Sequence, residues 1–456
     1  MNLATQFLRT ARSKNINEPA MVFVNKNGSK VLYSWHHLKL AAIMMAMDLK
    51  KMGIEKDDFV AIIALNLPES FIAMWSIILI GAVPVPIHAQ LVKQTNLEDI
   101  NKIINDCRPK LILANACLSK YLKYMKHLEV EKIIQNALEH VGASSTCGFA
   151  IELEIEELGD KIGRLLIMPY TSGTSGKPKG VRLSHRNIYN RVMAISKELA
   201  ITHDERILSY MPLGHISELI ATFFGQAVIG YTVYFTEHII DTLENREHFK
   251  KTFVKTLRIV KPTAFLSVPR IWKNFKKELE NKFEQKPILK IIPAWFKKIM
   301  IKKGLGLEKT RIFMSAASTL PKEDWQFFNN LLGIDILDIY GQTETAGPLT
   351  INGKPIGDNS TITISPTNEE ILVSGDCVMA GYHMNPEANR KVFSGNPWNR
   401  IYKTGDTGRP SSRDLNKIYF QGRIDDDFKL SNGEKINTAL REALEEKIKK
   451  NRSSHK

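Results

Sequence analysis

The residues best suited to chemistry form a short run rich in glycine, hydroxyl groups and lysine. Residues 170–180 read YTSGTSGKPKG, follow an apolar stretch and precede a helix that is expected to begin near Ser184. Glycines let the backbone wrap around an anion, so that main-chain N–H groups, hydroxyls and the lysines Lys177 and Lys179 converge on phosphate oxygens. The run is not a GxxxxGK[ST] loop, because Pro178 follows Lys177 and Thr171 takes the place of the first glycine. The sequence therefore predicts a phosphate-binding loop of another kind.

Two further motifs follow later in the chain. Residues 338–344 read DIYGQTE, in which an aromatic ring can face a nucleobase, a threonine hydroxyl can reach a phosphate and a carboxylate can hold Mg²⁺. Residues 402–406 read YKTGD and place a carboxylate in a turn. Each motif alone is weak evidence, because a strand-end turn or a capping aspartate gives the same letters.

In this order, the motifs resemble those of the adenylate-forming enzymes, which include acyl-CoA synthetases, luciferases and the adenylation domains of nonribosomal peptide synthetases. Residues 422–433, GRIDDDFKLSNG, resemble the hinge between the two domains of that family. The early blocks LYSWHHL and DFVAIIALNLPESFIAMWSIILIGAVPVPI also resemble it, so the resemblance covers nearly the whole chain, with a poor match over residues 131–163. A glycine-rich surface loop would explain the glycines of the first motif but not its lysines and hydroxyls.

The resemblance implies roles for the residues of the first two motifs. The nucleotide phosphates are bound by the loop residues Thr171, Ser172, Gly173, Thr174, Ser175, Gly176, Lys177 and Lys179. Tyr340 and Gly341 lie against adenine. Thr343 contacts the α-phosphate and Glu344 is the Mg²⁺ ligand, so Lys179, Thr343 and Glu344 are the expected catalytic residues together with His215.

The remaining expected site residues come from the other matching blocks. Asp406 accepts hydrogen bonds from the ribose hydroxyls, Arg423 approaches the nucleotide, and Asp425 is the hinge residue. Ala316 belongs to a small-residue strand end that shapes the adenine and acyl pockets. His215 is the candidate wall of the acyl site, against the alternative of an ordinary structural histidine.

The acid is expected to be a fatty acid. Residues 211–218, MPLGHISE, resemble the PLxHxxE block of long-chain fatty acyl-CoA synthetases and their bubblegum relatives, and the blocks SVPRIW and FKLSNGE agree. Glu218 lies in an apolar helix and is expected to make a buried structural hydrogen bond rather than to bind substrate. Amino-acid adenylation is disfavoured, because no acidic residue is placed for an α-amino group.

The resemblance thus predicts ATP- and Mg²⁺-dependent activation of a medium- or long-chain fatty acid to an acyl-adenylate, followed by thioester formation with coenzyme A. Positioning and charge neutralisation would carry the catalysis. No late lysine motif of the family's small domain is found after residue 433. Two alternatives therefore stay open: an impaired remnant that binds ATP or acyl groups, and a fatty acyl-AMP ligase that serves a carrier protein.

The elements that must position these motifs predict an α/β fold. Short apolar strands alternate with helical stretches such as Trp35–Lys51 up to about residue 338, which is typical of parallel sheets covered on both faces. We expect a large adenylate-forming domain, 1–421, with two parallel-type sheets flanked by helices and a small β-barrel-like subdomain. Residues 422–456 would form the hinge and the truncated start of a small α+β C-terminal domain.

The apolar stretches 71–87 and 216–235 are interrupted by glycine, proline or polar residues. They predict a buried helix followed by a buried strand rather than a membrane-spanning helix. The remaining strand predictions are 59–65, 110–114, 165–170, 231–235, 263–267, 334–339, 370–374 and 417–420.

The formal charge of +15 favours anionic partners. Residues 282–309 hold eight lysines and two glutamates with apolar residues between them, so they predict either peripheral contact with an anionic membrane or a solvated helical surface. Nucleic acid is disfavoured, since no basic stripe with stacking aromatics is found elsewhere. The four scattered cysteines form no CxxC pair, which favours a reducing, cytoplasmic location and predicts no zinc site.

Overall fold

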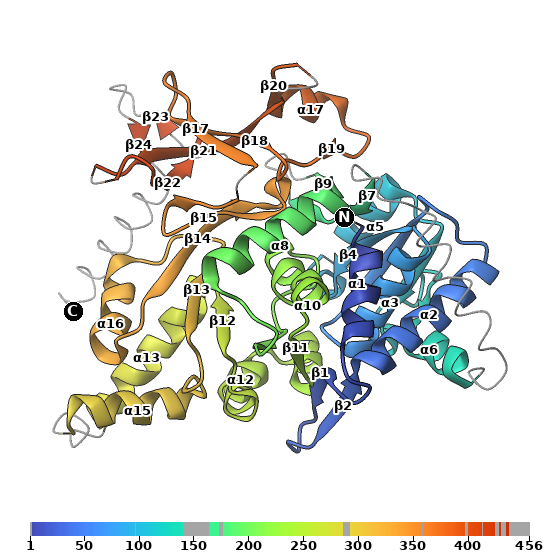
Figure 1. The fold of residues 1–456 in the computed structure, drawn as a ribbon, viewed down its shortest axis with the longest axis horizontal. Coiled ribbons are helices and arrows are strands. Elements are labelled where there is room, and N and C mark those ends of the chain that lie inside the picture. Colours follow the sequence, from blue (N-terminus) through green and yellow to red (C-terminus); the bar gives the residue numbers. More distant parts are fainter. Residues whose placement is uncertain are drawn as a thin grey trace.

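The computed structural model describes residues 2–95, 97–139, 164–172, 177–285, 292–357, 359–396, 400–412, 414–424, 428–429 and 435–436 (Figure 1). Helices and sheets alternate along most of the chain, which confirms the predicted α/β class. The predicted helix at Trp35–Lys51 is α2 with the same bounds, and its N-terminus is capped by the Ser34 hydroxyl, which accepts a hydrogen bond from the His37 N–H at 3.1 Å.

The first sheet has the strand order β4-β3-β5-β6 and is parallel throughout. Its strands are β3 (Phe59–Ala64), β4 (Val83–His88), β5 (Leu111–Ala114) and β6 (Leu128–Glu129). Its strands β3 and β4 are almost entirely buried, as expected for strands covered on both faces. The helical elements of this region are α1 (Leu3–Ser13), α2, α3 (Pro68–Leu79), α4 (Leu91–Gln94), α5 (Glu98–Cys107), η1 (Ala116–Leu118) and α6 (Val130–Glu139).

The second sheet, β10-β11-β1-β2, joins the N-terminus to the middle of the chain. Its strands are β1 (Pro19–Val24), β2 (Lys30–Ser34), β10 (Arg206–Leu208) and β11 (Thr232–Thr236). Between β10 and β11 lie α9 (Ile216–Glu218), the π-helical turn η3 (Leu219–Phe224) and α10 (Gly225–Ile229). After β11 follow η4 (Glu237–Ile240), α11 (Asp241–Glu244) and α12 (Arg246–Val260). The stretches 71–87 and 216–235 thus each run from helix into strand, as predicted.

The third sheet, β12-β13-β14-β15-β16, is parallel at its first three strands and antiparallel at the others. Its strands are β12 (Ala264–Ser267), β13 (Ile312–Ser315), β14 (Ile336–Gln342), β15 (Gly347–Ile351) and β16 (Lys354–Pro355). Its helices are α13 (Pro269–Gln285), α15 (Ala294–Leu305) and α16 (Lys322–Leu332). β14 begins two residues later than predicted and runs three residues further, into the YGQ motif.

Two further sheets and the two-stranded pair β23-β24 complete the described structure. The first contains β7 (Leu165–Ile167), β8 (Tyr170–Ser172), β9 (Pro178–Ser184) and β19 (Gly381–Tyr382), and β9 leads into α8 (His185–Leu199). The second is antiparallel and contains β17 (Ser360–Ile364), β18 (Glu370–Gly375), β20 (Phe393–Ser394), β21 (Ile401–Pro410) and β22 (Ile418–Arg423). The other elements are η5 (Thr343–Thr345), α17 (Pro386–Val392), β23 (Phe428–Lys429) and β24 (Lys435–Ile436). The antiparallel sheet lies where the small barrel-like unit was expected, above β14 and β15 in Figure 1.

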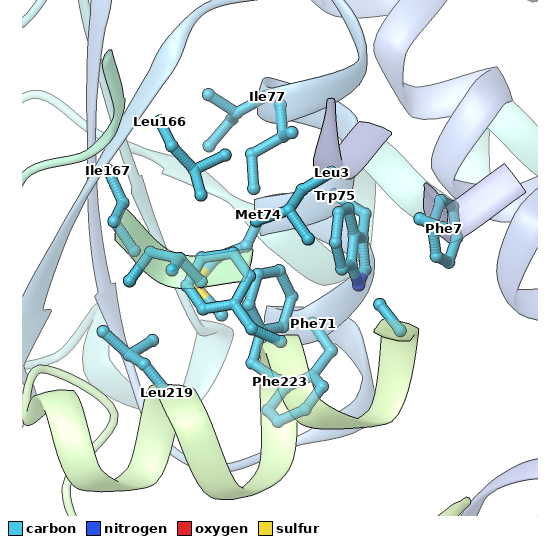
Figure 2. Packing of buried hydrophobic residues seen from close by; sticks show 14 of the residues in the cluster. Leu3, Phe7, Phe71, Met74, Trp75, Ile77, Leu166, Ile167, Leu219 and Phe223 are labelled. Atoms are coloured by element: carbon cyan, nitrogen blue, oxygen red, sulfur yellow. The ribbon is translucent and has the colours of Figure 1, made fainter. Parts of the chain in front are cut away.

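The largest core packs aromatic side chains from distant segments against one another (Figure 2). Trp75 of α3 is stacked between Phe7 of α1, at 4.4 Å between ring centroids, and Phe223 of η3, at 4.6 Å. Phe71 meets Phe223 edge to face at 5.2 Å. These contacts hold the first two sheets together and therefore position the segment 211–218 that precedes η3. Within the described part of the chain, no helix is both long and apolar enough to cross a bilayer.

Candidate active site

The second and third motifs meet at the carboxylate of Asp406. The Tyr340 hydroxyl donates a hydrogen bond to Asp406 Oδ2 at 2.9 Å, and Gln342 Nε2 donates to the same oxygen at 2.5 Å. Arg423 forms an ion pair with Asp406 Oδ1 at 3.0 Å. The strands β14, β21 and β22 supply these side chains, so residues far apart in sequence form one polar cluster.

Burial controls the ionisation of Asp406. The side chain is almost inaccessible to solvent, and this desolvation raises the pKa of the carboxyl, while Arg423, Tyr340 and Gln342 oppose the rise. A carboxylate has about four lone-pair positions, and three protein donors already use some of them. About one lone-pair position of Asp406 therefore remains for a further donor such as a ribose hydroxyl.

The Tyr340 ring lies in a defined orientation. Phe420 of β22 stacks beside it with ring centroids 5.5 Å apart and an interplanar angle of 22°. Since the hydroxyl is held by Asp406, the ring cannot rotate freely, and a planar base would find a preformed aromatic surface. Sequence reasoning assigned Tyr340 to adenine but assigned no role to Phe420, which appeared only as the end of a predicted strand.

Tyr382 links the phosphate-loop lysine to the expected metal ligand. Its hydroxyl donates to Glu344 Oε1 at 2.9 Å, while Lys179 Nζ lies 5.1 Å from the centroid of its ring. Burial raises the pKa of Glu344, and the charges of Arg423 and Lys179 act in the opposite direction. Tyr382 was missed by sequence analysis, because nothing in its local sequence distinguishes it from a buried core tyrosine.

The phosphate loop is carried by a hairpin. Residues Tyr170, Thr171 and Ser172 of β8 pair with Gly180, Lys179 and Pro178 of β9, respectively. The loop residues Gly173, Thr174, Ser175 and Gly176, and the side chain of Ser172, lie outside the described residues. Lys177 is exposed at the start of the second arm.

The end of this hairpin begins a helix, as predicted near Ser184. The Ser184 hydroxyl accepts the Asn187 N–H at 3.2 Å, and the Ser184 N–H donates back to Asn187 Oδ1 at 2.8 Å. On its other side, β9 pairs with β19, which brings Tyr382 opposite Val181. The same strand therefore holds both the loop and the tyrosine that contacts Glu344.

Gly341 and Thr343 stand on the same strand end as Tyr340. A Cβ atom at position 341 would lie 2.2 Å from the Gly347 carbonyl oxygen, so only glycine fits against β15. Thr343 is partly buried and begins the turn η5, directly before Glu344. The carboxylate of Glu344 and the hydroxyl of Thr343 are oxygen donors of the kind that Mg²⁺ prefers, so the residues present fit that ion.

An apolar cavity lies between α8, η3 and the third sheet. Its wall includes Val192, Ile195, Leu199, Ile220, Ala221, Leu266, Met314, Ala316, Ile339 and Pro348. Ala316 thus lies at this cavity, and Ile339 directly precedes Tyr340. The cavity wall is almost entirely apolar, and Ile339 places it next to the polar cluster.

His215 is exposed directly before α9, at the end of a mostly buried segment, and it is not among the residues that line the apolar cavity. Ser217 lines the apolar cavity, whereas Pro212 and Leu213 line a second, more polar one. The His215 ring centroid is 5.8 Å from that of His88, and reduced hydration by the surrounding atoms lowers the pKa of His215. A neutral imidazole is therefore favoured near neutral pH.

Glu218 is fully buried and makes the structural hydrogen bonds predicted for it. Its carboxylate accepts hydrogen bonds from Asn66 Nδ2 at 3.0 Å and from the Thr222 hydroxyl at 2.9 Å. Ser209 Oγ and the Met211 N–H complete the set at 2.5 and 3.2 Å. Burial raises the pKa of Glu218 to about 7, despite these donors. The expected hinge residue Asp425 lies outside the described residues.

The fold and this site define an adenylate-forming type of protein, in which the hairpin that carries Lys179, the buried carboxylate of Asp406 and the ring of Tyr340 lie close to one another. The family of AMP-binding enzymes matches residues 7–383, and the chain belongs to that family.

Similar proteins agree with this assignment. The rat (Rattus norvegicus) long-chain-fatty-acid–CoA ligase ACSBG2 is 28% identical over 453 residues, covering 86% of this chain and 65% of the relative. The human (Homo sapiens) ACSBG2 is 26% identical over 491 residues, covering 94% of this chain and 71% of the relative. The chain thus spans about two thirds of the length of these relatives.

Solved structures show the same fold. O-succinylbenzoate coenzyme A synthetase (MenE) from Bacillus subtilis, in complex with AMP, superposes with a TM-score of 0.71 at 21% identity, over 95% of this chain and 81% of that one. McyG A-PCP complexed with phenylalanyl-adenylate gives a TM-score of 0.73 at 17% identity, over 96% of this chain and 78% of that one.

Proposed function

We propose that the protein uses ATP and Mg²⁺ to convert a medium- or long-chain fatty acid to an acyl-adenylate and then transfers the acyl group to coenzyme A. The observation that carries the proposal is the convergence of Tyr340, Glu344 and Asp406 beside Lys179, at the edge of an apolar cavity. The similarity to long-chain-fatty-acid–CoA ligases favours a fatty acid over other acids.

In this proposal a carboxylate oxygen attacks the α-phosphorus, the bond to the bridging oxygen breaks, and pyrophosphate leaves. Lys179 and Lys177 neutralise the β- and γ-phosphates, and Thr343 orients the α-phosphate. Bound Mg²⁺ would supply additional charge neutralisation at Glu344. Tyr340 and Asp406 hold the nucleoside, so that little motion of the reacting groups remains. No covalent intermediate with the enzyme forms.

The apolar cavity is proposed to hold the acyl chain. Ala221 lies on η3 in its wall, and a larger side chain there would fill space that a long chain needs. We expect Ala221→Phe to lower activity with long acids more than with short ones, and Ala194→Phe, on α8 but not among the lining residues, to leave the ratio unchanged. An equal loss at all chain lengths in Ala221→Phe would contradict this placement.

The reaction is tested by incubating the full chain with ATP, Mg²⁺ and fatty acids of several lengths, and by measuring pyrophosphate and acyl-CoA separately. Both products support the proposal. Pyrophosphate without thioester favours the acyl-AMP ligase that serves a carrier protein, and the absence of both products with retained ATP binding favours the non-catalytic remnant.

We further propose a cytoplasmic protein that touches anionic membranes through α15. Four large apolar side chains of this helix face solvent, with exposed fractions of 67% for Trp295, 44% for Phe296, 54% for Ile299 and 41% for Met300. Lys303 lies on the same face by its helical position, whereas Lys297 lies over the Phe283 ring. Apolar side chains with adjacent positive charge suit the headgroup region of an anionic bilayer, where a fatty acid substrate also partitions.

Sedimentation with vesicles of phosphatidylcholine, with and without phosphatidylserine, tests this contact. Because burial of one large apolar side chain contributes about 1.5–3 kcal/mol, Ile299→Glu should weaken binding by about tenfold or more. Leu415→Glu is the matched control, since Leu415 is 79% exposed at another place on the surface. Equal binding of all three proteins, or no binding by the unaltered chain, would exclude the proposal and favour a solvated helical surface.

A further inference from the structure

Three side chains outside the active site converge on one point of the surface. His238 of η4, Asp241 of α11 and His248 of α12 place their ligand atoms within 4.8 Å of one another, and among the described residues this is the one such group of three or more His, Cys, Asp or Glu side chains. His238 Nδ1 lies 3.0 Å and His248 Nε2 lies 3.5 Å from the same atom, Asp241 Oδ2.

These distances are close to those of a tetrahedral metal site. Zinc binds imidazole nitrogen and carboxylate oxygen at about 2.0–2.2 Å, so two ligands of one tetrahedral ion lie roughly 3.3–3.6 Å apart. The His248 to Asp241 distance falls in this range, and the His238 to Asp241 distance needs to open by only a few tenths of an ångström. We propose that these three residues bind one divalent transition-metal ion, with Zn²⁺ as the best-suited ion and water as the fourth ligand.

The exposure of the ligands suits this role. The side chains of His238 and Asp241 are only 9% and 14% exposed, whereas that of His248 is 50% exposed. Two ligands are therefore held in place by packing, and the third leaves the site open to an incoming ion and to water. Two imidazoles and one carboxylate favour Zn²⁺, Ni²⁺ or Co²⁺ over Mg²⁺, which prefers oxygen ligands.

Lys26 sits on the other side of the same carboxylate. Its Nζ lies 2.8 Å from Asp241 Oδ1, and its backbone N–H donates to Glu237 Oε2 at 2.8 Å. The carboxylate thus already attracts a cation at one oxygen, while the histidines face the other. Because the Lys26 charge repels a metal ion, its removal should raise the metal affinity.

The three proposed metal ligands lie next to residues that line the second cavity. Ile239 and Thr242, the neighbours of two ligands, and Phe249 and Lys250, which follow the third, line the second cavity near His88. A bound ion would tie η4 and α11 to α12 and stiffen this wall. The inference is independent of the proposed acyl chemistry, because its test measures metal binding alone.

The test is calorimetric titration of the metal-free full chain with Zn²⁺ in excess Mg²⁺, and titration with Co²⁺ followed by visible absorption. We expect one ion per chain, a tetrahedral Co²⁺ spectrum, and affinity reduced by about tenfold or more in His248→Ala and Asp241→Asn. Lys26→Gln should raise affinity by roughly fivefold. His203→Ala is the matched control, since His203 lies 3.0 Å from Asp204 at the surface without a third ligand.

Equal Zn²⁺ binding by the unaltered chain and His248→Ala, or loss of binding in His203→Ala, would overturn the proposal. Absence of binding in the unaltered chain would overturn it as well. Because His248 is half exposed, its substitution should leave the fold intact, and Tyr124→Ala provides a second surface variant for comparing circular dichroism.

Discussion

The hydroxyl of Tyr340 lies 2.9 Å from Asp406 Oδ2, although 66 residues separate the two along the chain. This hydrogen bond couples the strand end expected to face adenine with the turn expected to bind ribose. A change at either residue therefore affects the orientation of the other, and the nucleoside would meet the pair as a unit.

Asp406→Asn should weaken ATP binding by about tenfold or more, because hydrogen bonds to a charged group contribute roughly 1.5–3 kcal/mol. Unaltered protein should bind 2′-deoxy-ATP less tightly than ATP, and the variant should lose this discrimination. Equilibrium binding of both nucleotides measures the effect. Asp414→Asn, in the surface turn between β21 and β22, serves as the control, and preserved discrimination in Asp406→Asn would refute the ribose assignment.

Lys179→Ala should slow pyrophosphate release by about 10²–10³-fold, as expected for the loss of one group that neutralises developing phosphate charge. Lys354→Ala removes a surface lysine that pairs with Glu198 at 2.9 Å and should leave the rate unchanged. A rate for Lys179→Ala within a few-fold of that of Lys354→Ala would show that the lysine near Tyr382 does not contact phosphate.

Tyr382→Phe should shift the acid side of the pH–rate profile to higher pH. The tyrosine donates a hydrogen bond to Glu344 and thereby lowers a pKa that burial raises, so its removal raises the pKa of Glu344 further. Mg²⁺ binding needs the carboxylate, and more of it would be protonated at a given pH. Rates measured across pH at fixed Mg²⁺ test this expectation, and an unchanged profile would argue against Glu344 as the ligand.

Glu218→Gln should change how stability depends on pH. Burial raises the folded-state pKa of Glu218 to about 7 from its ordinary value of 4.5, so between these values the folded chain binds more protons than the unfolded chain. The contribution of this group is therefore fully present below about pH 4.5 and is lost as the pH rises toward 7, by roughly 3 kcal/mol. The variant should lack this decline. Denaturant unfolding at several pH values would reveal it, with Glu198→Gln, an exposed ion-pair partner, as the control.

Gly341→Ala should destabilise the fold as well as weaken nucleotide binding. The added Cβ would lie 2.2 Å from a backbone oxygen of β15, which cannot move without breaking the strand pairing. We expect a loss of about 1–3 kcal/mol in the free energy of unfolding, typical of overpacking. Gly304→Ala, at a position with no atom within 4 Å of the new Cβ, is the control. Unchanged stability with weaker ATP binding would assign Gly341 to the nucleotide alone.

Local sequence patterns were sufficient to predict many of the helices and strands and the chemical types of the site residues. The α2 bounds, the helix start after Ser184 and the buried role of Glu218 follow from nearest-neighbour features: capping, apolar periodicity and an acidic residue in an apolar helix. The phosphate loop and the strand-end motifs are contiguous, so their residue types could be identified without knowing what surrounds them.

The contacts between those motifs depended on strand pairing that no local pattern specifies. Tyr382 reaches Glu344 because β19 pairs with β9, and Phe420 reaches Tyr340 because β22 pairs with β21. Likewise His238, Asp241 and His248 meet through the packing of α11 and α12, whereas the sequence pattern predicted no zinc site. The order of residues carries chemical identity, whereas distance, burial and shifted pKa values arise only when separate segments share one core.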